Sequence, residues 1–229
     1  MFADLHIHSC LSPCADNDMT PHNILGMASI KGLDIIAITD HNATLNLPSF
    51  LELQEDYGVQ VMPGIEVTSK EEVHILGYFL ELAQAQQAGE LFLRALPDKK
   101  NITDIFGNQY IISAEDEITG ELDALLIGNT SYSITEVVDI IRAHHGVAVP
   151  AHVNRGNNGM LINQGFIPED LHFTSIEYAR HLPIDFNLLK NKHLLISSDA
   201  HNLGSILEQE FSLPRYVDSK EDLFEWLNS

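Results

Sequence analysis

Basic residues are scarce in this chain. Lys and Arg number 12 against 33 Asp and Glu, which gives a formal net charge of -21 at pH 7. A surface this acidic repels phosphate backbones at long range, so long duplex nucleic acid is not an expected partner. A small anionic substrate stays compatible with this charge, because bound divalent cations reverse its sign locally.

Cysteine and long hydrophobic runs are also nearly absent. No segment approaches the roughly 18 consecutive apolar residues of a membrane span, and the first residues do not resemble a secretory signal. We therefore expect a cytoplasmic protein with no membrane partner. The two cysteines, Cys10 and Cys14, do not suggest a disulfide framework. They are interpreted as reduced thiols in a loop, with a ligand or redox role as the alternative.

Strand and helix signals alternate along most of the sequence. Phe2 to His8 alternates apolar and polar residues, which predicts a strand, and Thr20-Pro21 opens a helix that Gly32 closes. The apolar run Leu33 to Thr39 is typical of a buried parallel strand. Further strands are expected at 59–62, 73–79, 147–150, 175–178 and 193–197, and helices begin near 133 and 219. Repeated strand–helix units predict a parallel sheet, open or closed as a barrel, with its chemistry at the carboxyl ends of the strands.

Residues 81–130 interrupt this alternation. A glutamine-rich stretch at 83–88 predicts a helix, and Gly107 to Gly120 predicts a hairpin with an acidic turn at 114–117. We interpret the stretch as an insertion or cap on one domain that comprises residues 1–229.

Histidines and carboxylates gather at the predicted strand ends. They are His6, His8, Asp40, His41, Glu66, His74, His152, Asp199 and His201. Two imidazoles two residues apart share one face of a strand, because strand side chains alternate with period two. Nitrogen and oxygen donors favour Zn, Mn or Fe, and the set is too large for one tetrahedral ion. The sequence therefore predicts two or three divalent ions, with Glu66 as the bridging carboxylate, an arrangement that suits phosphate hydrolysis.

Six short segments resemble, in order, the motifs of the PHP (polymerase and histidinol phosphatase) superfamily. They are Asp4-Leu5-His6-Ile7-His8-Ser9, Ile38-Thr39-Asp40-His41-Asn42, Pro63-Gly64-Ile65-Glu66-Val67, His74-Ile75-Leu76-Gly77-Tyr78, Pro150-Ala151-His152 and Ser198-Asp199-Ala200-His201. They span nearly the whole chain. The resemblance implies a distorted (β/α)7 barrel and a small metal-dependent phosphoesterase.

The resemblance also implies three metal positions. His6, His8, Glu66 and Asp199 would hold the first ion; Glu66, His74 and His152 the second; Asp16, His41 and His201 the third. Asp16 is inferred because residues 16–21 are similar to an Asp-Gly-x-Leu-Thr-Pro stretch of small PHP phosphoesterases. Asn17 replaces that glycine and the preceding loop is longer, so Asp18 is the rival ligand.

Other polar residues are expected to support the metal centre. Asp4 and Asp40 are interpreted as groups that orient ligand histidines through their free ring nitrogens. Arg155 and Arg180 are candidates to grip substrate phosphate, with surface ion pairs as the alternative. His181 is a candidate proton donor.

The function expected from these residues is hydrolysis of a small phosphate ester by a metal-bridging hydroxide. The substrate would be a nucleotide, a short oligonucleotide or a phosphorylated metabolite. One alternative is a non-catalytic metal-binding sensor or assembly accessory protein that uses the same barrel. A metal hydrolase acting on carbon–nitrogen bonds is a second alternative. Such an enzyme usually has a lysine that bridges the metal ions, and no lysine here lies at a convincing strand end.

Overall fold

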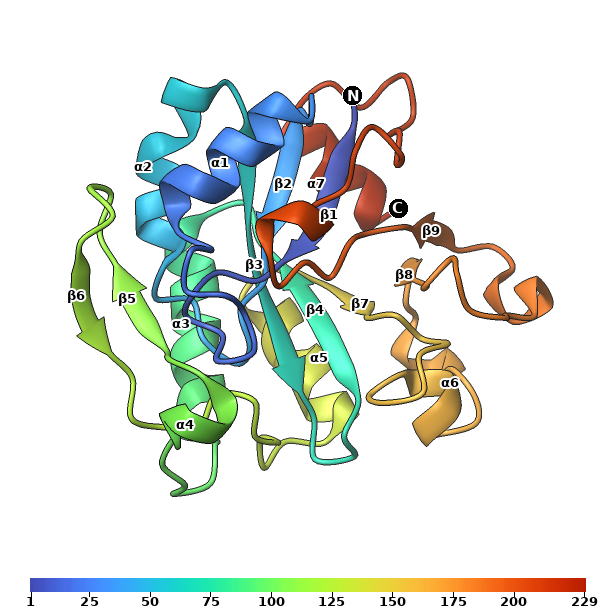
Figure 1. Ribbon diagram of the computed structural model, residues 1–229. Coiled ribbons are helices and arrows are strands. Elements are labelled where there is room, and N and C mark those ends of the chain that lie inside the picture. The colour runs from blue at the N-terminus through green and yellow to red at the C-terminus, as the bar shows by residue number, and fades with distance from the viewer.

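The computed structural model describes all residues 1–229 (Figure 1). Its main sheet has five strands. In spatial order they are β1 (Ala3–Ile7), β2 (Ile35–Ile38), β3 (Gln60–Thr68), β4 (His74–Tyr78) and β7 (Val147–Pro150). The first three strands run parallel, whereas β4 is antiparallel to both of its neighbours. The expectation of a wholly parallel sheet is therefore wrong at β4. Only residues 69–73 join β3 to β4, and a parallel crossover needs a dozen residues or more.

Two further strands extend the curl of this sheet. They are β8 (Ser175–Glu177) and β9 (His193–Leu195), which pair in parallel. On one side, the amide of Val153 after β7 donates to the Glu177 carbonyl at 3.0 Å. On the other, Ile7 forms a parallel bridge with Ala200 after β9. The result is a mixed α/β fold with a curled half-barrel sheet, in which these seven strands form a five-stranded and a two-stranded sheet. The exact (β/α)7 barrel stays a prediction.

Helices cover both faces of the sheet. They are α1 (Pro21–Ile30), α2 (Leu47–Tyr57), α3 (Leu82–Arg94), α4 (Thr103–Phe106), α5 (Ile134–Ala143), α6 (Met160–Asn163) and α7 (Lys220–Leu227). Ile36 and Ile38 of β2 pack into the larger apolar cluster with α1, α2, α3 and α5. Ile35 and Ala37 pack into a second cluster with α7. Because alternate side chains of β2 are buried on opposite faces, this strand reads as an unbroken apolar run. No helix combines the length and the apolar character needed to cross a membrane.

Most predicted element starts are confirmed. Helix α1 begins at Pro21, and Gly32 follows its end with φ of 70°. Thr20 occupies the cap position but makes no capping bond; its hydroxyl instead donates to Asp116 at 2.6 Å. Ser133 and Glu136 form the expected capping box of α5.

Residues 81–130 contain the helix and hairpin that were expected. Helix α3 runs further than predicted, and the hairpin consists of β5 (Tyr110–Ile112) and β6 (Ile118–Glu121). Figure 1 shows this green hairpin lying beside α2 and α3, at one edge of the molecule. Its status as an insertion on a single domain stays a prediction.

Candidate metal centre

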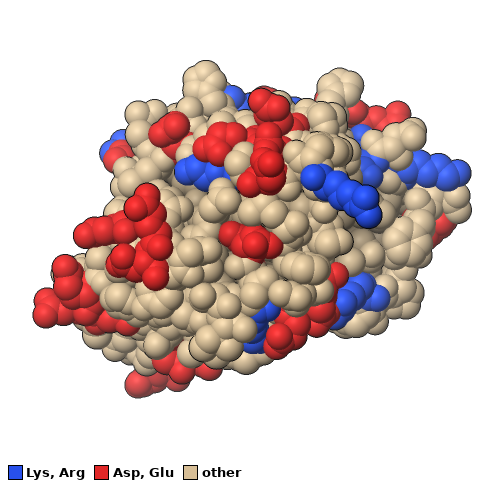
Figure 2. Space-filling view, turned by 90° about the horizontal axis from the view of Figure 1, so that it is seen from above, with Lys and Arg blue, Asp and Glu red and all other residues tan.

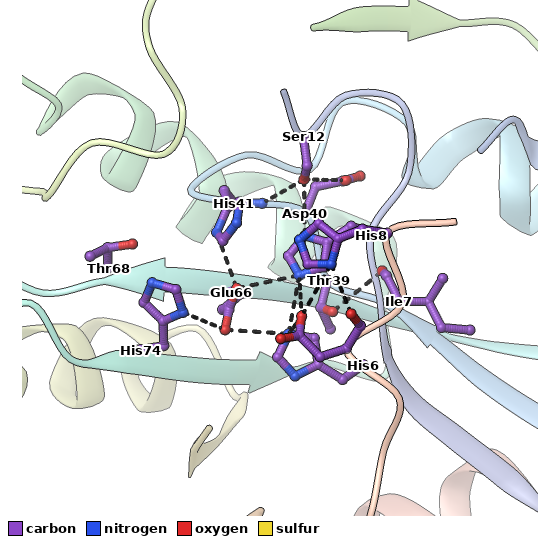
Figure 3. Close-up of polar contacts among 12 residues, drawn as sticks. His6, Ile7, His8, Ser12, Thr39, Asp40, His41, Glu66, Thr68 and His74 are labelled. Atoms are coloured by element: carbon purple, nitrogen blue, oxygen red, sulfur yellow. Dashed lines mark hydrogen bonds and ion pairs between the residues drawn. The ribbon is translucent and has the colours of Figure 1, made fainter. Parts of the chain in front are cut away.

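The carboxyl end of β1 supplies two fully buried histidines. His6 and His8 lie two residues apart in the strand direction, and their Nε2 atoms are 3.2 Å from each other (Figure 3). Strand alternation explains why both rings leave the same face. Two imidazole nitrogens at this separation can act as donors to one ion or to adjacent ions.

Glu66 of β3 lies at the centre of the site and is 1% exposed. Its two carboxylate oxygens face five imidazoles, as Figure 3 shows in part. The nitrogen–oxygen distances are 3.3 Å to His6, 3.4 Å to His8, 3.1 Å to His41, 2.7 Å to His74 and 3.2 Å to His152. A carboxylate surrounded in this way has the position expected of a bridge between two metal ions.

The segment after β9 closes the other side of the site. Asp199 Oδ1 lies 3.1 Å from His8 Nε2 and 3.4 Å from His6 Nε2. The His201 ring stacks on the His8 ring with centroids 4.3 Å apart. Asp199 has a φ of 53° and His152 has a φ of 27°, both in the left-handed region that side chains rarely adopt. Such backbone conformations concentrate at functional sites, where the surrounding structure holds them.

Three groups of donor atoms converge closely enough to share an ion. Within each group all ligand atoms lie within 4.8 Å of one another; the groups are His6, His8, Glu66 and Asp199; His41, Glu66 and His74; and His8, His41 and His201. The first is the quartet that the sequence motifs imply. In the other two, the structure places His41 beside His74 and His8 beside His201. His152 contacts Glu66 but belongs to none of the three groups.

The structure does not bring Asp16 into these groups. Its side chain is exposed, and its backbone amide donates to the His201 carbonyl at 2.8 Å. Asp18 is exposed as well, and its carbonyl accepts a hydrogen bond from the Asn23 amide. The choice between these two carboxylates stays a prediction.

Burial and charge together shape the pKa values in the cluster. Burial opposes ionisation of Glu66, but His74, His6 and the other imidazoles outweigh it and hold the Glu66 pKa well below its usual range. Burial also opposes protonation of His8, yet Asp199 and Glu66 raise its pKa to about 9. Burial and the nearby His8 lower the pKa of His201 to about 3. Carboxylates that stay ionised beside imidazoles in a buried space are the electrostatic setting of a cation site.

Two of the buried donor atoms have no hydrogen-bond partner, which also fits a bound cation. His41 Nδ1 and Glu66 Oε2 lie 3.1 Å apart, but neither has a hydrogen-bond partner with acceptable geometry. Buried polar atoms without a partner are costly, and divalent ions bound to these two donors would satisfy both. The mixture of imidazole and carboxylate donors suits Zn, Mn or Fe.

A second layer of polar groups orients the β1 histidines. Glu177 of β8 accepts a hydrogen bond from His6 Nδ1, with contacts of 3.0 and 3.2 Å to its two oxygens, and another from the His152 amide at 2.9 Å. Ser12 Oγ lies 3.0 Å from His8 Nδ1. With Nδ1 held in this way, each ring presents Nε2 to the cluster. Sequence reasoning missed Glu177, although this carboxylate lies one residue before the end of the strand predicted at 175–178.

The two aspartates expected to orient histidines act less directly. Asp40 contacts no ring nitrogen; it accepts from Ser12 Oγ at 2.7 Å, and Ser12 holds His8. Asp4 accepts from the backbone amides of Ser198 and Leu207, both at 2.9 Å, and so anchors the segment that carries Asp199.

The cationic candidates line a cavity of about 280 Å³ beside the cluster, together with Tyr178 and Ser205. Arg155 forms an ion pair with Asp199, and Arg180 forms one with Glu210. Both arginines are about half exposed, and His181 is exposed at the same cavity. The structure therefore places all three predicted residues within one space next to the metal cluster.

The two cysteines differ in environment. Cys14 is exposed and lines a second cavity of about 310 Å³ together with His41 and His201. Cys10 is buried, and its burial and the nearby Asp40 raise its pKa to about 12. Cys14 is thus the thiol that lies near the candidate metal ligands.

Comparison with known proteins finds a matching family model and related sequences. The PHP domain model matches residues 4–144. The phosphoribosyl 1,2-cyclic phosphate 1,2-diphosphodiesterase of Eggerthella lenta is 40% identical over 86 residues, which are 35% of this chain and 32% of that protein. The alignment therefore spans about a third of the length of that curated relative.

Solved structures show a similar fold. A candidate metal-dependent phosphoesterase from Bifidobacterium adolescentis has a TM-score of 0.66 at 16% identity, with 99% of this chain and 95% of that chain covered. The lesion-specific endonuclease PfuEndoQ from Pyrococcus furiosus has a TM-score of 0.65 at 19% identity, with 88% and 48% covered. At such identities the likeness concerns the fold alone.

Proposed function

Because the chain belongs to the PHP domain family, we propose that it is a metal-dependent phosphoesterase that hydrolyses a small phosphate ester. The observation that carries this proposal is the single carboxylate of Glu66, which faces five imidazoles while Asp199 faces two of them from the opposite side. The matched relative from Eggerthella lenta is named as a phosphodiesterase, which supports the same class of chemistry.

We further propose three ion positions, with the ligands that the sequence motifs imply. They are His6, His8, Glu66 and Asp199 for the first ion; Glu66, His74 and His152 for the second; and His41, His201 and Asp16 for the third. Divalent ions in these positions would supply Lewis acidity at the phosphoryl oxygens. The residues contribute fixed geometry, because Glu177 and Ser12 hold the β1 rings from behind.

The cavity beside the cluster provides a place for the rest of the substrate. Arg155 and Arg180 reach it from two different loops, and an arginine can grip a phosphate oxygen pair through two parallel hydrogen bonds. Substrate phosphate would replace Asp199 and Glu210 as their partners. His181 at the same cavity would donate a proton to the leaving alkoxide.

The surface charge favours small substrates. Figure 2 shows acidic side chains spread over the face it presents, with only separate groups of basic ones. With a net charge of -21, the chain would repel a long duplex. PfuEndoQ is named as an endonuclease, but its likeness to this chain is one of fold. We therefore propose nucleotides, short oligonucleotides or phosphorylated metabolites as substrates.

The decisive experiment measures phosphate or alcohol release from a panel of mono- and diesters. Protein loaded with Mn²⁺ or Zn²⁺ is compared with the His6→Ala/His8→Ala variant and with His144→Gln, a histidine variant at the end of α5. Turnover that survives in His144→Gln and is lost in the double variant would support the proposal, and the preferred ester would identify the substrate class. Stoichiometric metal without turnover of any ester would refute it and favour a metal-binding sensor.

A further inference from the structure

Asn46 links residues 81–130 to the strands that carry the metal ligands. It is fully buried at the cap position of α2, yet its side chain makes no capping bond to that helix. Instead its Oδ1 accepts from the Ile112 amide at 3.0 Å, and its Nδ2 donates to the Tyr110 carbonyl at 3.1 Å. The same Nδ2 donates to Ser9 Oγ at 3.0 Å. Asparagine is a preferred capping residue, so its use for β5 instead indicates a different role.

From Ser9 the hydrogen bonds continue to His8. Ser9 Oγ donates to Asp40 Oδ2 at 2.6 Å, and Ser12 Oγ donates to Asp40 Oδ1 at 2.7 Å. Ser12 Oγ in turn accepts from His8 Nδ1 at 3.0 Å and from the His41 amide at 3.1 Å. All of these side chains are buried.

The direction of each bond follows from the capacity of the groups. A hydroxyl has one proton to donate and two lone pairs that accept, and a carboxylate only accepts. Ser12 therefore gives its proton to Asp40 and receives those of the His41 amide and His8 Nδ1. Ser9 likewise gives its proton to Asp40 and receives from Asn46 and from the Leu11 amide at 3.2 Å. His8 therefore turns Nε2 toward Glu66 and Asp199, where this nitrogen would bind an ion once its proton is released.

We propose that Asn46 is a positioning residue of the metal centre, which transmits the location of β5 through Ser9, Asp40 and Ser12 to the ring of His8. Residues 81–130 are then part of the frame that sets a ligand orientation, and not only a cover over the site. The inference rests on the proposed role of His8 as a metal ligand. It adds a segment that no ligand motif of the sequence includes.

The test compares Asn46→Ala with a matched control, Gln109→Ala. Gln109 is also fully buried and makes three hydrogen bonds, to the Leu122 and Ala124 carbonyls at 2.7 Å and from the Leu126 amide at 2.9 Å. These bonds stay within residues 81–130, so the control removes a comparable set of buried hydrogen bonds without removing a link of the path to His8.

Two measurements separate positioning from simple loss of stability. The first is zinc affinity by competition with a chromophoric chelator, where Asn46→Ala should bind about tenfold more weakly and Gln109→Ala within twofold of the parent. The second is the ring N–H signal of His8 in zinc-loaded protein labelled with ¹⁵N-histidine. It should exchange slowly in the parent and in Gln109→Ala, and broaden in Asn46→Ala.

Equal zinc affinity in Asn46→Ala and the parent, or equal weakening in both variants, would overturn the proposal. If Asn46→Ala does not fold, Ser9→Ala breaks the next link without removing the contacts to β5, and the same two results are expected of it. A folded Ser9→Ala with parental zinc affinity and a sharp His8 signal would overturn the proposal as well. Neither measurement needs turnover, so failure of the phosphoesterase proposal would be seen separately in the ester panel.

Discussion

Glu177 offers the sharpest test of how the metal centre is built. It is 2% exposed, and its carboxylate holds both the His6 ring and the His152 amide. Glu177→Gln keeps the shape of the side chain and one oxygen that can accept both bonds, but it removes the negative charge. Burial opposes the ionisation of Glu177, yet His6 outweighs it and lowers the pKa of this carboxyl. The charge that the substitution removes is therefore present at neutral pH.

The size of the effect follows from the contacts that are lost. Removing a group that orients a metal-bound histidine costs about 10–100-fold in metal affinity, or about 1.4–2.7 kcal/mol. We expect Glu177→Gln to lie near the lower value because its amide oxygen replaces part of the contact. Glu177→Ala should lie near the upper value and also lower the free energy of unfolding by about 1–3 kcal/mol, because it leaves the buried His152 amide without a partner.

The assay is a zinc titration against a chelator, with urea unfolding of the metal-free protein in parallel. Glu136→Gln is the control, since it makes the same chemical change at an exposed residue of α5. Zinc affinity in Glu177→Gln within twofold of the parent would refute the reasoning. So would an equal loss in the control, because the effect would then follow from net charge alone.

Three further outcomes are expected. The pKa of His8 is raised to about 9 in the metal-free protein, so protons compete with the metal ion below that pH. Zinc affinity measured by calorimetry should therefore rise with pH up to about 9, with release of protons on binding. A zinc affinity that does not change with pH would contradict this. Cys14 should react quickly with a thiol reagent while buried Cys10 reacts only on unfolding, and two fast thiols in native protein would disprove it. Gly107→Ala should lower the free energy of unfolding by roughly 3 kcal/mol or more. The reason is that Gly107 has a φ of 97° and an added Cβ would lie 2.1 Å from the Pro13 carbonyl oxygen. An unchanged urea midpoint would contradict this prediction.

The candidate ligands could be proposed from the sequence because several of them lie only two residues apart. His6 and His8 are two residues apart at the end of β1, where strand alternation brings both rings to one face. Asp199 and His201 are also two residues apart, but they follow β9 outside any strand, and Asp199 has a φ of 53°. Strands β1 and β2 could also be predicted, β1 from its alternation of apolar and polar residues and β2 from the continuous apolar run before Asp40. Asp16 lacks such a signal, because loop geometry, and not strand period, determines where its carboxylate points.

The sequence alone thus determined the positions of the strands, the helix starts at Pro21 and Ser133, and the set of imidazoles and carboxylates at the strand ends. Each of these depends on neighbours within a few residues. Only the tertiary structure decided that β4 runs antiparallel, that Glu177 reaches His6 across 171 positions, and that Asn46 joins β5 to Ser9. Those contacts arise where distant segments are packed into one buried space, and hydrogen-bond partners there are selected by proximity in three dimensions, which no local periodicity encodes.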